Sequence, residues 1–80
     1  MSIIHIITLS AYELKDGGFR GVILIRDTKE RIASPILSTL KEATYWVKSN
    51  LYNMMKDVPY KLAPIRIKNE YRANVWVREE

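Results

Sequence analysis

The chain has 80 residues, with 13 Lys and Arg, 9 Asp and Glu, one His and no Cys. A usual size of ~100–200 residues per domain predicts that residues 1–80 form a single domain. The absence of cysteine excludes a disulfide framework and the usual cysteine-containing zinc sites. The 48% hydrophobic and 28% charged content is typical of a globular chain, and the net charge of +4 favours anionic partners.

The apolar N-terminal stretch lacks the features of a targeting segment. No basic residue precedes it, His5 and Thr8 interrupt it, and no small-residue cleavage site follows. No other stretch approaches the ~20 apolar residues that span a bilayer. We therefore expect a cytoplasmic protein that makes no membrane contact.

Three strands are predicted in the first half of the chain. Residues 3–12 are rich in β-branched types and apolar on both faces, which predicts an interior strand. Residues 15–18 read Lys-Asp-Gly-Gly, and such glycine pairs supply the positive φ angles of hairpin turns. A second strand over residues 19–26 follows. After a type I turn at residues 27–30, a short third strand covers residues 31–34 and ends at a proline.

A helix is predicted to begin after Thr39. The Thr39 hydroxyl can accept a hydrogen bond from the Glu42 N–H, and the Glu42 carboxylate can reach back, which is the capping-box pattern. Apolar residues then recur at helical spacing, and Pro59 ends the helix at or before Val58. The helical stripe comprises Leu40, Ala43, Thr44, Val47, Leu51, Met54, Met55 and Val58.

The last third of the chain is predicted to form a second hairpin. Pro64 opens it, residues 65–68 and 71–78 form its strands, and a tight turn lies near residues 69–70. Alternation predicts an inner set consisting of Ile65, Ile67, Tyr71, Ala73, Val75 and Val77. The outer set then consists of Arg66, Lys68, Arg72, Asn74, Trp76 and Arg78.

The predicted fold class is α+β, with the element order β-β-β-α-β-β. About five strands would form one antiparallel sheet with the helix packed on one face. A single helix cannot cover both faces of such a sheet. The second face must therefore be solvated, or it must bind a partner.

The outer set of the last hairpin is the main candidate site. Lys and Arg neutralise phosphates, and an aromatic ring can stack on an unpaired base. Two further arginines bracket Val22 and Leu24 on the second strand. The candidate residues for binding RNA, DNA or another partner are Arg66, Lys68, Arg72, Trp76, Arg78, Arg20 and Arg26. The alternative is a solvated face, whose outward cations protect edge strands from aggregation.

A protein interface or a homodimer is a second possibility. Val22 and Leu24 would favour such a contact if they are exposed. Tyr45 and Tyr52 share a stripe on the predicted helix. Trp46 either packs at the flank of the helix or joins these tyrosines in an aromatic interface.

The sequence contains few residues that would indicate catalysis, metal binding or cofactor binding. His5 is the sole histidine, and no carboxylates cluster with it at a ligand spacing. No nucleophile elbow, phosphate loop or dinucleotide fingerprint is present. We expect a non-catalytic protein without metal or cofactor, and a small enzyme that uses His5 is the remaining alternative.

Two resemblances add to this interpretation. Gly18-Phe19, a charged turn, a short strand and the helix start at residues 38–43 resemble small β-β-β-α modules over about half of the chain. The arm-site DNA-binding domains of phage integrases and small bacterial stress-type domains are examples. The second hairpin departs from both, and no functional residue is transferred.

The second resemblance is one of composition. A short, Cys-free chain rich in Lys, Asn, Ile and Tyr resembles the small anti-defence accessory proteins by which bacteriophages take over a host. No specific family is matched. The resemblance implies an inhibitor that binds nucleic acid, or a host protein or nucleoprotein complex.

Overall fold

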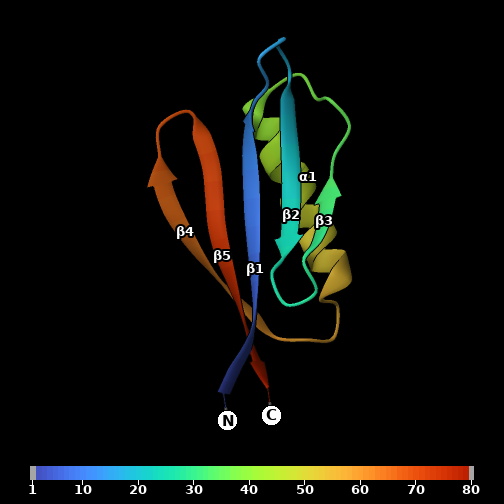
Figure 1. Cartoon of the computed structure of the whole chain (residues 1–80), viewed down its shortest axis with the longest axis vertical. Coiled ribbons are helices and arrows are strands. Elements are labelled where there is room, and N and C mark those ends of the chain that lie inside the picture. The colour runs from blue at the N-terminus through green and yellow to red at the C-terminus, as the bar shows by residue number, and fades with distance from the viewer. Residues whose placement is uncertain (1, 80) are drawn as a thin grey trace.

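The computed structural model describes the backbone of residues 2–79 and the side chains of residues 7–77. Its elements follow the predicted β-β-β-α-β-β order (Figure 1). They are β1 (Ser2–Glu13), β2 (Phe19–Ile25), β3 (Glu30–Ala33), α1 (Leu40–Met54), β4 (Tyr60–Ile67) and β5 (Glu70–Glu79). Among the described residues, no helix is long and apolar enough to cross a membrane.

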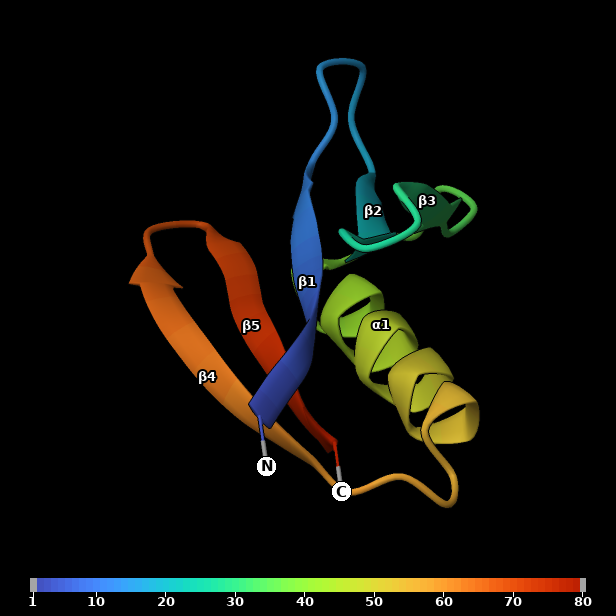
Figure 2. The same ribbon diagram turned by 60° about the horizontal axis from the view of Figure 1, so that its bottom comes forward.

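The five strands form one antiparallel sheet in the order β3-β2-β1-β5-β4, which confirms the predicted α+β class. β1 lies at the centre, which confirms the predicted interior strand. The β4–β5 hairpin curves away from the rest of the sheet, and the helix lies beside β1 and β2 (Figure 2). One face is therefore covered mainly over its β1–β2 half.

The helix packs on the sheet through a small set of fully buried residues. Ala43, Val47 and Leu51 face the sheet, where Leu9 and Ile23 are equally buried. Gly21 permits this close approach, since a Cβ at that position would lie 2.6 Å from Val47 Cγ1. The Gly21 N–H donates to the buried Ser34 hydroxyl at 2.8 Å.

The ends of the helix differ in part from the prediction. The Thr39 hydroxyl accepts the Glu42 N–H at 3.1 Å, as predicted. The Glu42 carboxylate accepts the N–H of Ser38 at 2.9 Å, one residue before the expected partner. The helix ends at Met54, within the predicted limit of Val58, and Met55 and Val58 of the predicted stripe lie beyond it. Pro59 disfavours helical backbone at the residue before it, and the chain leaves the helix within the preceding turn.

The register of the second hairpin overturns the predicted facing of β4. The strand begins at Tyr60 and includes Pro64, which is tolerated because β4 is an edge strand. Ile67 pairs with Glu70, so the loop contains two residues, and its second residue, Asn69, has a φ of 63°. A two-residue loop pairs each odd-numbered residue of β4 with an even-numbered residue of β5.

This parity moves the β4 side chains to the faces opposite those predicted. Ile65 lies across from Arg72, and Ile67 lies across from Glu70. Arg66 lies across from Tyr71, on the face that the helix covers. The predicted inner and outer sets are therefore wrong for β4. They are correct for Tyr71, Ala73, Val75 and Val77 of β5, of which the last three are buried.

Candidate functional site

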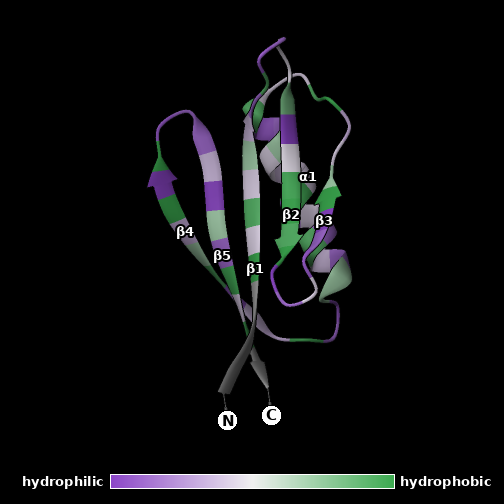
Figure 3. Cartoon of the chain, in the orientation of Figure 1, coloured by the Kyte–Doolittle hydropathy of each residue, from purple (hydrophilic) through white to green (hydrophobic). Residues whose placement is uncertain are grey.

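The open face is defined here as the sheet face opposite α1, seen from the front in Figure 1. Cross-strand pairs determine which side chains meet there. Ser10 lies between Val22 and Arg72, and Thr8 lies between Leu24 and Asn74. Along β5, hydrophilic residues of this face alternate with hydrophobic residues of the core (Figure 3). The open face thus has a continuous polar band over β1 and β5.

Positive charge lies on both sides of this band and within it. Its cations within the described side chains are Arg20, Arg31, Lys61 and Arg72. Glu70 supplies a carboxylate to the same face, and its Oε1 lies 3.4 Å from Arg72 Nη2. Four cations and one carboxylate leave this part of the face positively charged. Its potential therefore favours an anionic partner.

Arg20 differs from the other cations of the open face. It pairs with Tyr12 across β1 and β2, and its side chain is half-buried. Its Nε is buried and has no hydrogen-bond partner among the described residues. Arg31, Lys61 and Arg72 are exposed. They are therefore accessible to solvent and to a large ligand.

Two aromatic side chains lie near opposite ends of the polar band. Tyr12 of β1 lies across from Arg20, and Trp76 of β5 lies across from Lys61. Both are half-buried, so part of each side chain remains accessible. The hydroxyls of Thr8 and Ser10 and the Asn74 amide lie between them along β1 and β5. The open face therefore combines aromatic, hydrogen-bonding and cationic groups.

The structure brings together only some of the predicted binding residues. Arg20, Arg72 and Trp76 share the open face. The expectation that Arg66 and Lys68 share it is wrong, because Arg66 is on the helix side and Lys68 is in the hairpin turn. Arg26 follows the end of β2 and is exposed in a loop. Arg78 is in β5, but its side chain lies outside the described residues.

Three cationic or aromatic residues of the open face, Lys61, Arg31 and Tyr12, were not singled out from the sequence. Lys61 requires a strand that starts before Pro64, whereas a proline usually begins or ends a strand. Arg31 is in the exposed β3 and lies across from Leu24. Tyr12 alternates with buried residues of β1, and this alternation was the signal that could have identified it.

The predicted apolar contact at Val22 and Leu24 is only partly available. Both residues are on the open face. Val22 is 7% exposed and Leu24 is 38% exposed. Val22 is flanked by Arg20 and Leu24 on its own strand, which leaves little of its surface accessible. The pair therefore does not form a broad exposed apolar patch.

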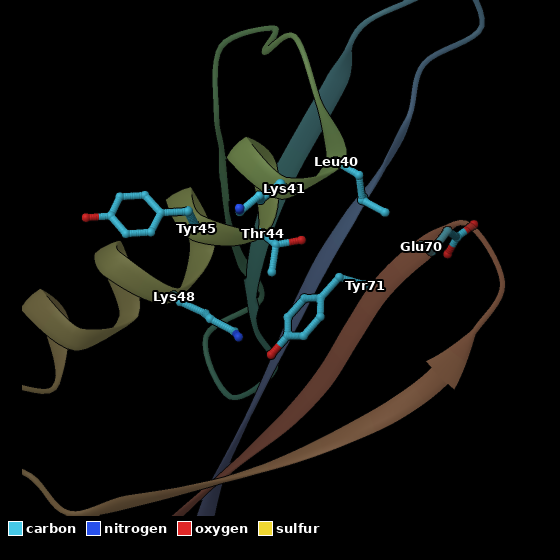
Figure 4. A pocket seen from close by; sticks show the side chains of 7 residues that line it. All are labelled: Leu40, Lys41, Thr44, Tyr45, Lys48, Glu70 and Tyr71. Atoms are coloured by element: carbon cyan, nitrogen blue, oxygen red, sulfur yellow. The ribbon is translucent and has the colours of Figure 1, made fainter.

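The helix carries a second accessible surface. Tyr45 and Tyr52 are 73% and 64% exposed, whereas Trp46 packs against the core. Beside Tyr45, a shallow cleft separates α1 from the start of β5 (Figure 4). Its lining residues are Leu40, Lys41, Thr44, Tyr45, Lys48, Glu70 and Tyr71.

Tyr71 forms one wall of this cleft. Lys48 points toward it in Figure 4, and Lys48 Nζ lies 5.0 Å from the centre of the Tyr71 ring. This distance is that of a cation–π contact. Burial raises the pKa of the Tyr71 hydroxyl above its usual value of 10.0. The cleft therefore offers an aromatic wall and two lysines.

The described part of the chain contains no cluster of metal-ligating side chains. No group of three or more His, Cys, Asp or Glu residues lies close enough there to hold a metal ion. His5 is in β1, next to a register irregularity with β5, and its side chain lies outside the described residues. Comparisons with known protein families, curated proteins and solved structures found no match to this chain.

Proposed function

We propose that this protein is a non-catalytic binding protein whose open face engages nucleic acid. The observation that supports this most directly is the register of β4 and β5. Trp76 lies across from Lys61, and Arg72 lies on the same face two pairs further along. An aromatic ring with cations beside it can stack on a base while the cations neutralise the adjoining phosphates.

The remainder of the open face supports the same proposal. Arg20 and Arg31 extend the positive charge across β2 and β3. Thr8, Ser10 and Asn74 supply hydroxyl and amide groups that can hydrogen-bond bases or sugars. A purely apolar protein interface would not need this polar band at its centre.

A charge-reversal pair tests the proposal directly. Lys61→Glu with Arg72→Glu should abolish binding to a fluorescently labelled oligonucleotide, measured by anisotropy at low salt. The control is Lys15→Glu with Lys56→Glu, which changes the net charge equally at exposed positions in the first hairpin turn and after the helix. The control should retain binding. Equal losses in both variants, or no binding by the wild type, would contradict the proposal.

Binding of nucleic acid by the open face would inhibit a host nucleoprotein complex when the bound nucleic acid belongs to that complex. The resemblance to phage anti-defence proteins implies this role. The open face would then occupy the nucleic acid, or the nucleic-acid-binding surface, of a host nucleoprotein complex. Adding the purified protein to such a complex should lower its activity, and the Lys61→Glu, Arg72→Glu variant should not.

A protein interface on the helix is the second candidate. It is favoured by the exposure of Tyr45 and by the cleft in which Lys48 contacts Tyr71. Lys41 and Lys48 would attract acidic side chains, and exposed tyrosines are frequent anchors of protein interfaces. Glu70, which also lines the cleft, is paired with Arg72.

A glutamate–tyrosine copolymer is a suitable probe for this second surface. Its binding should shift the amide NMR signals of residues 40–48 and of Tyr71. Lys41→Glu with Lys48→Glu should remove these shifts. Shifts confined to the open face, or no shifts, would exclude the helix surface as an acidic-peptide site.

A further inference from the structure

We infer that the open face takes single-stranded nucleic acid, which runs along β1 and β5 between Tyr12 and Trp76. This inference rests on the proposed function and specifies its substrate class. Its basis is the placement of two partly accessible aromatic side chains near the ends of one polar band. Stacking on either ring requires a base whose face is free, as in a single strand.

The shape of the open face argues against a duplex. The major groove of DNA is about 12 Å wide and admits a helix or a two-stranded ribbon that projects into it. The helix of this protein, α1, lies on the opposite face (Figures 1 and 2). Tyr12 and Trp76 are half-buried on a sheet surface, so they cannot project into a groove. The paired bases of a duplex would therefore remain out of their reach.

The spacing of the aromatic side chains sets the length of the site. Trp76 pairs with Ile6 of β1, which is six residues from Tyr12 along the same strand. At about 3.3 Å per residue, the position of Trp76 and that of Tyr12 are roughly 20 Å apart along β1. Stacked nucleotides advance about 3.4 Å each, so this distance corresponds to about six nucleotides, or fewer in an extended strand. This value falls within the ~4–16 nucleotides seen for other single-strand-binding domains.

The charged residues lie on both sides of this path and within it. Lys61 is on the β4 side and Arg20 and Arg31 are on the β2–β3 side, whereas Arg72 lies within the path on β5. Between them, Ser10 and Thr8 of β1 pair with Arg72 and Asn74 of β5. A strand laid along this band would have hydrogen-bonding groups beneath its bases and cations within reach of its phosphates.

Tryptophan fluorescence provides the test. The chain has two tryptophans, and Trp46 of α1 packs against the hydrophobic core. In a Trp46→Phe background the signal reports Trp76 alone, and anisotropy of a labelled oligonucleotide with the wild-type protein gives an independent measurement. The probes are oligothymidylates of about three, six and twelve nucleotides, in line with the expected site size. A hairpin duplex serves as the comparison.

Three results are expected. Single strands should quench Trp76, and their affinity should rise up to about six nucleotides and then level off. The duplex should bind more weakly than a single strand of the same length and should not quench Trp76, because its paired bases cannot stack on the ring. Tyr12→Ala should weaken the longer oligonucleotides by roughly 5- to 150-fold, the loss of one stacked base, but should leave trinucleotide quenching intact. Tyr52→Ala, an exposed tyrosine on the helix, is the matched control and should bind normally.

The outcomes separate this inference from the proposed function. If no nucleic acid binds, both are refuted. If duplex and single strands bind equally, or if binding leaves Trp76 fluorescence unchanged, the open-face path is refuted while nucleic-acid binding stands. A Tyr12→Ala variant that binds every length normally would also overturn the path, provided that its far-UV circular dichroism matches that of the wild type.

Discussion

Substitution of Gly21 by alanine tests how closely the helix approaches the sheet. The added Cβ would lie 2.6 Å from Val47 Cγ1, 2.9 Å from the Ala43 carbonyl oxygen and 3.3 Å from Trp46 Cε3. Gly21 is not among the residues with a positive φ, so the backbone itself accepts alanine. The cost is therefore steric, and overpacking of this kind destabilises by about 1–3 kcal/mol.

This cost should be visible in thermal and urea unfolding. For a domain of this size, each kcal/mol lowers the Tm by about 4–8 °C, so a cost of about 2 kcal/mol corresponds to a fall of about 8–16 °C. The urea midpoint should also fall, while the slope of the unfolding free energy against urea concentration, the m value, stays unchanged. A Gly21→Ala protein within about 0.5 kcal/mol of the wild type would refute the close approach.

A double-mutant cycle with Val47→Ala identifies the cause. Val47 is fully buried, so its truncation alone should destabilise the protein. In the Gly21→Ala background the same truncation removes the nearest clash and should cost at least about 0.5 kcal/mol less. The contact with the Ala43 oxygen remains, so the double variant should not recover fully. Strict additivity would show that the two residues do not meet.

Three further predictions concern charge, a buried hydrogen bond and pH. The four open-face cations predict that a plot of log affinity against log salt concentration has a slope of about −2.8 for a single strand. Arg31→Gln should reduce the magnitude of that slope by about 0.7, and binding titrations at several salt concentrations will measure both slopes. Ser34→Ala leaves the buried Gly21 N–H without its acceptor and should cost about 1–3 kcal/mol in urea unfolding; a loss below about 0.5 kcal/mol would be inconsistent with that bond. Burial raises the pKa of the Tyr71 hydroxyl, so the buried neutral side chain contributes its full stability below the unfolded-state pKa. This contribution is lost as the pH rises through the folded-state pKa. In urea unfolding between about pH 9.5 and 11, the wild type should therefore lose more stability than the Tyr71→Phe variant. Equal losses in the two proteins would argue against a raised pKa at Tyr71.

Local sequence signals predicted the elements of the fold well. The glycine pair at residues 17–18 forms the first turn, with φ angles of 91° and 82°. Thr39 caps the helix through Glu42. These features depend on residues a few positions apart, and the chemistry of turns and caps is nearly independent of the rest of the chain. The interior position of β1 was also predictable from its many β-branched and apolar residues, although Thr8 and Ser10 make its open face polar.

The composition of the candidate site was less predictable. A loop that differs by one residue reverses every side chain of a strand relative to its partner. The two-residue turn at residues 68–69 therefore moved Arg66 to the helix side and brought Lys61 opposite Trp76. Pro64 concealed the early start of β4, which is compatible with proline only because that strand is at the edge.

The order and type of the elements, the first turn and the start of the helix follow from the amino-acid sequence alone, since short-range hydrogen bonding and hydrophobic periodicity specify these features. Which cations share a face becomes clear only once the strands are paired in the folded chain. Arg20 and Arg31 of β2 and β3 lie on the same face as Lys61 and Arg72 of β4 and β5 because the register of four strand pairings aligns them. β1 and β5 come from opposite ends of the chain, so no local segment can specify their pairing, which aligns the two halves of this face.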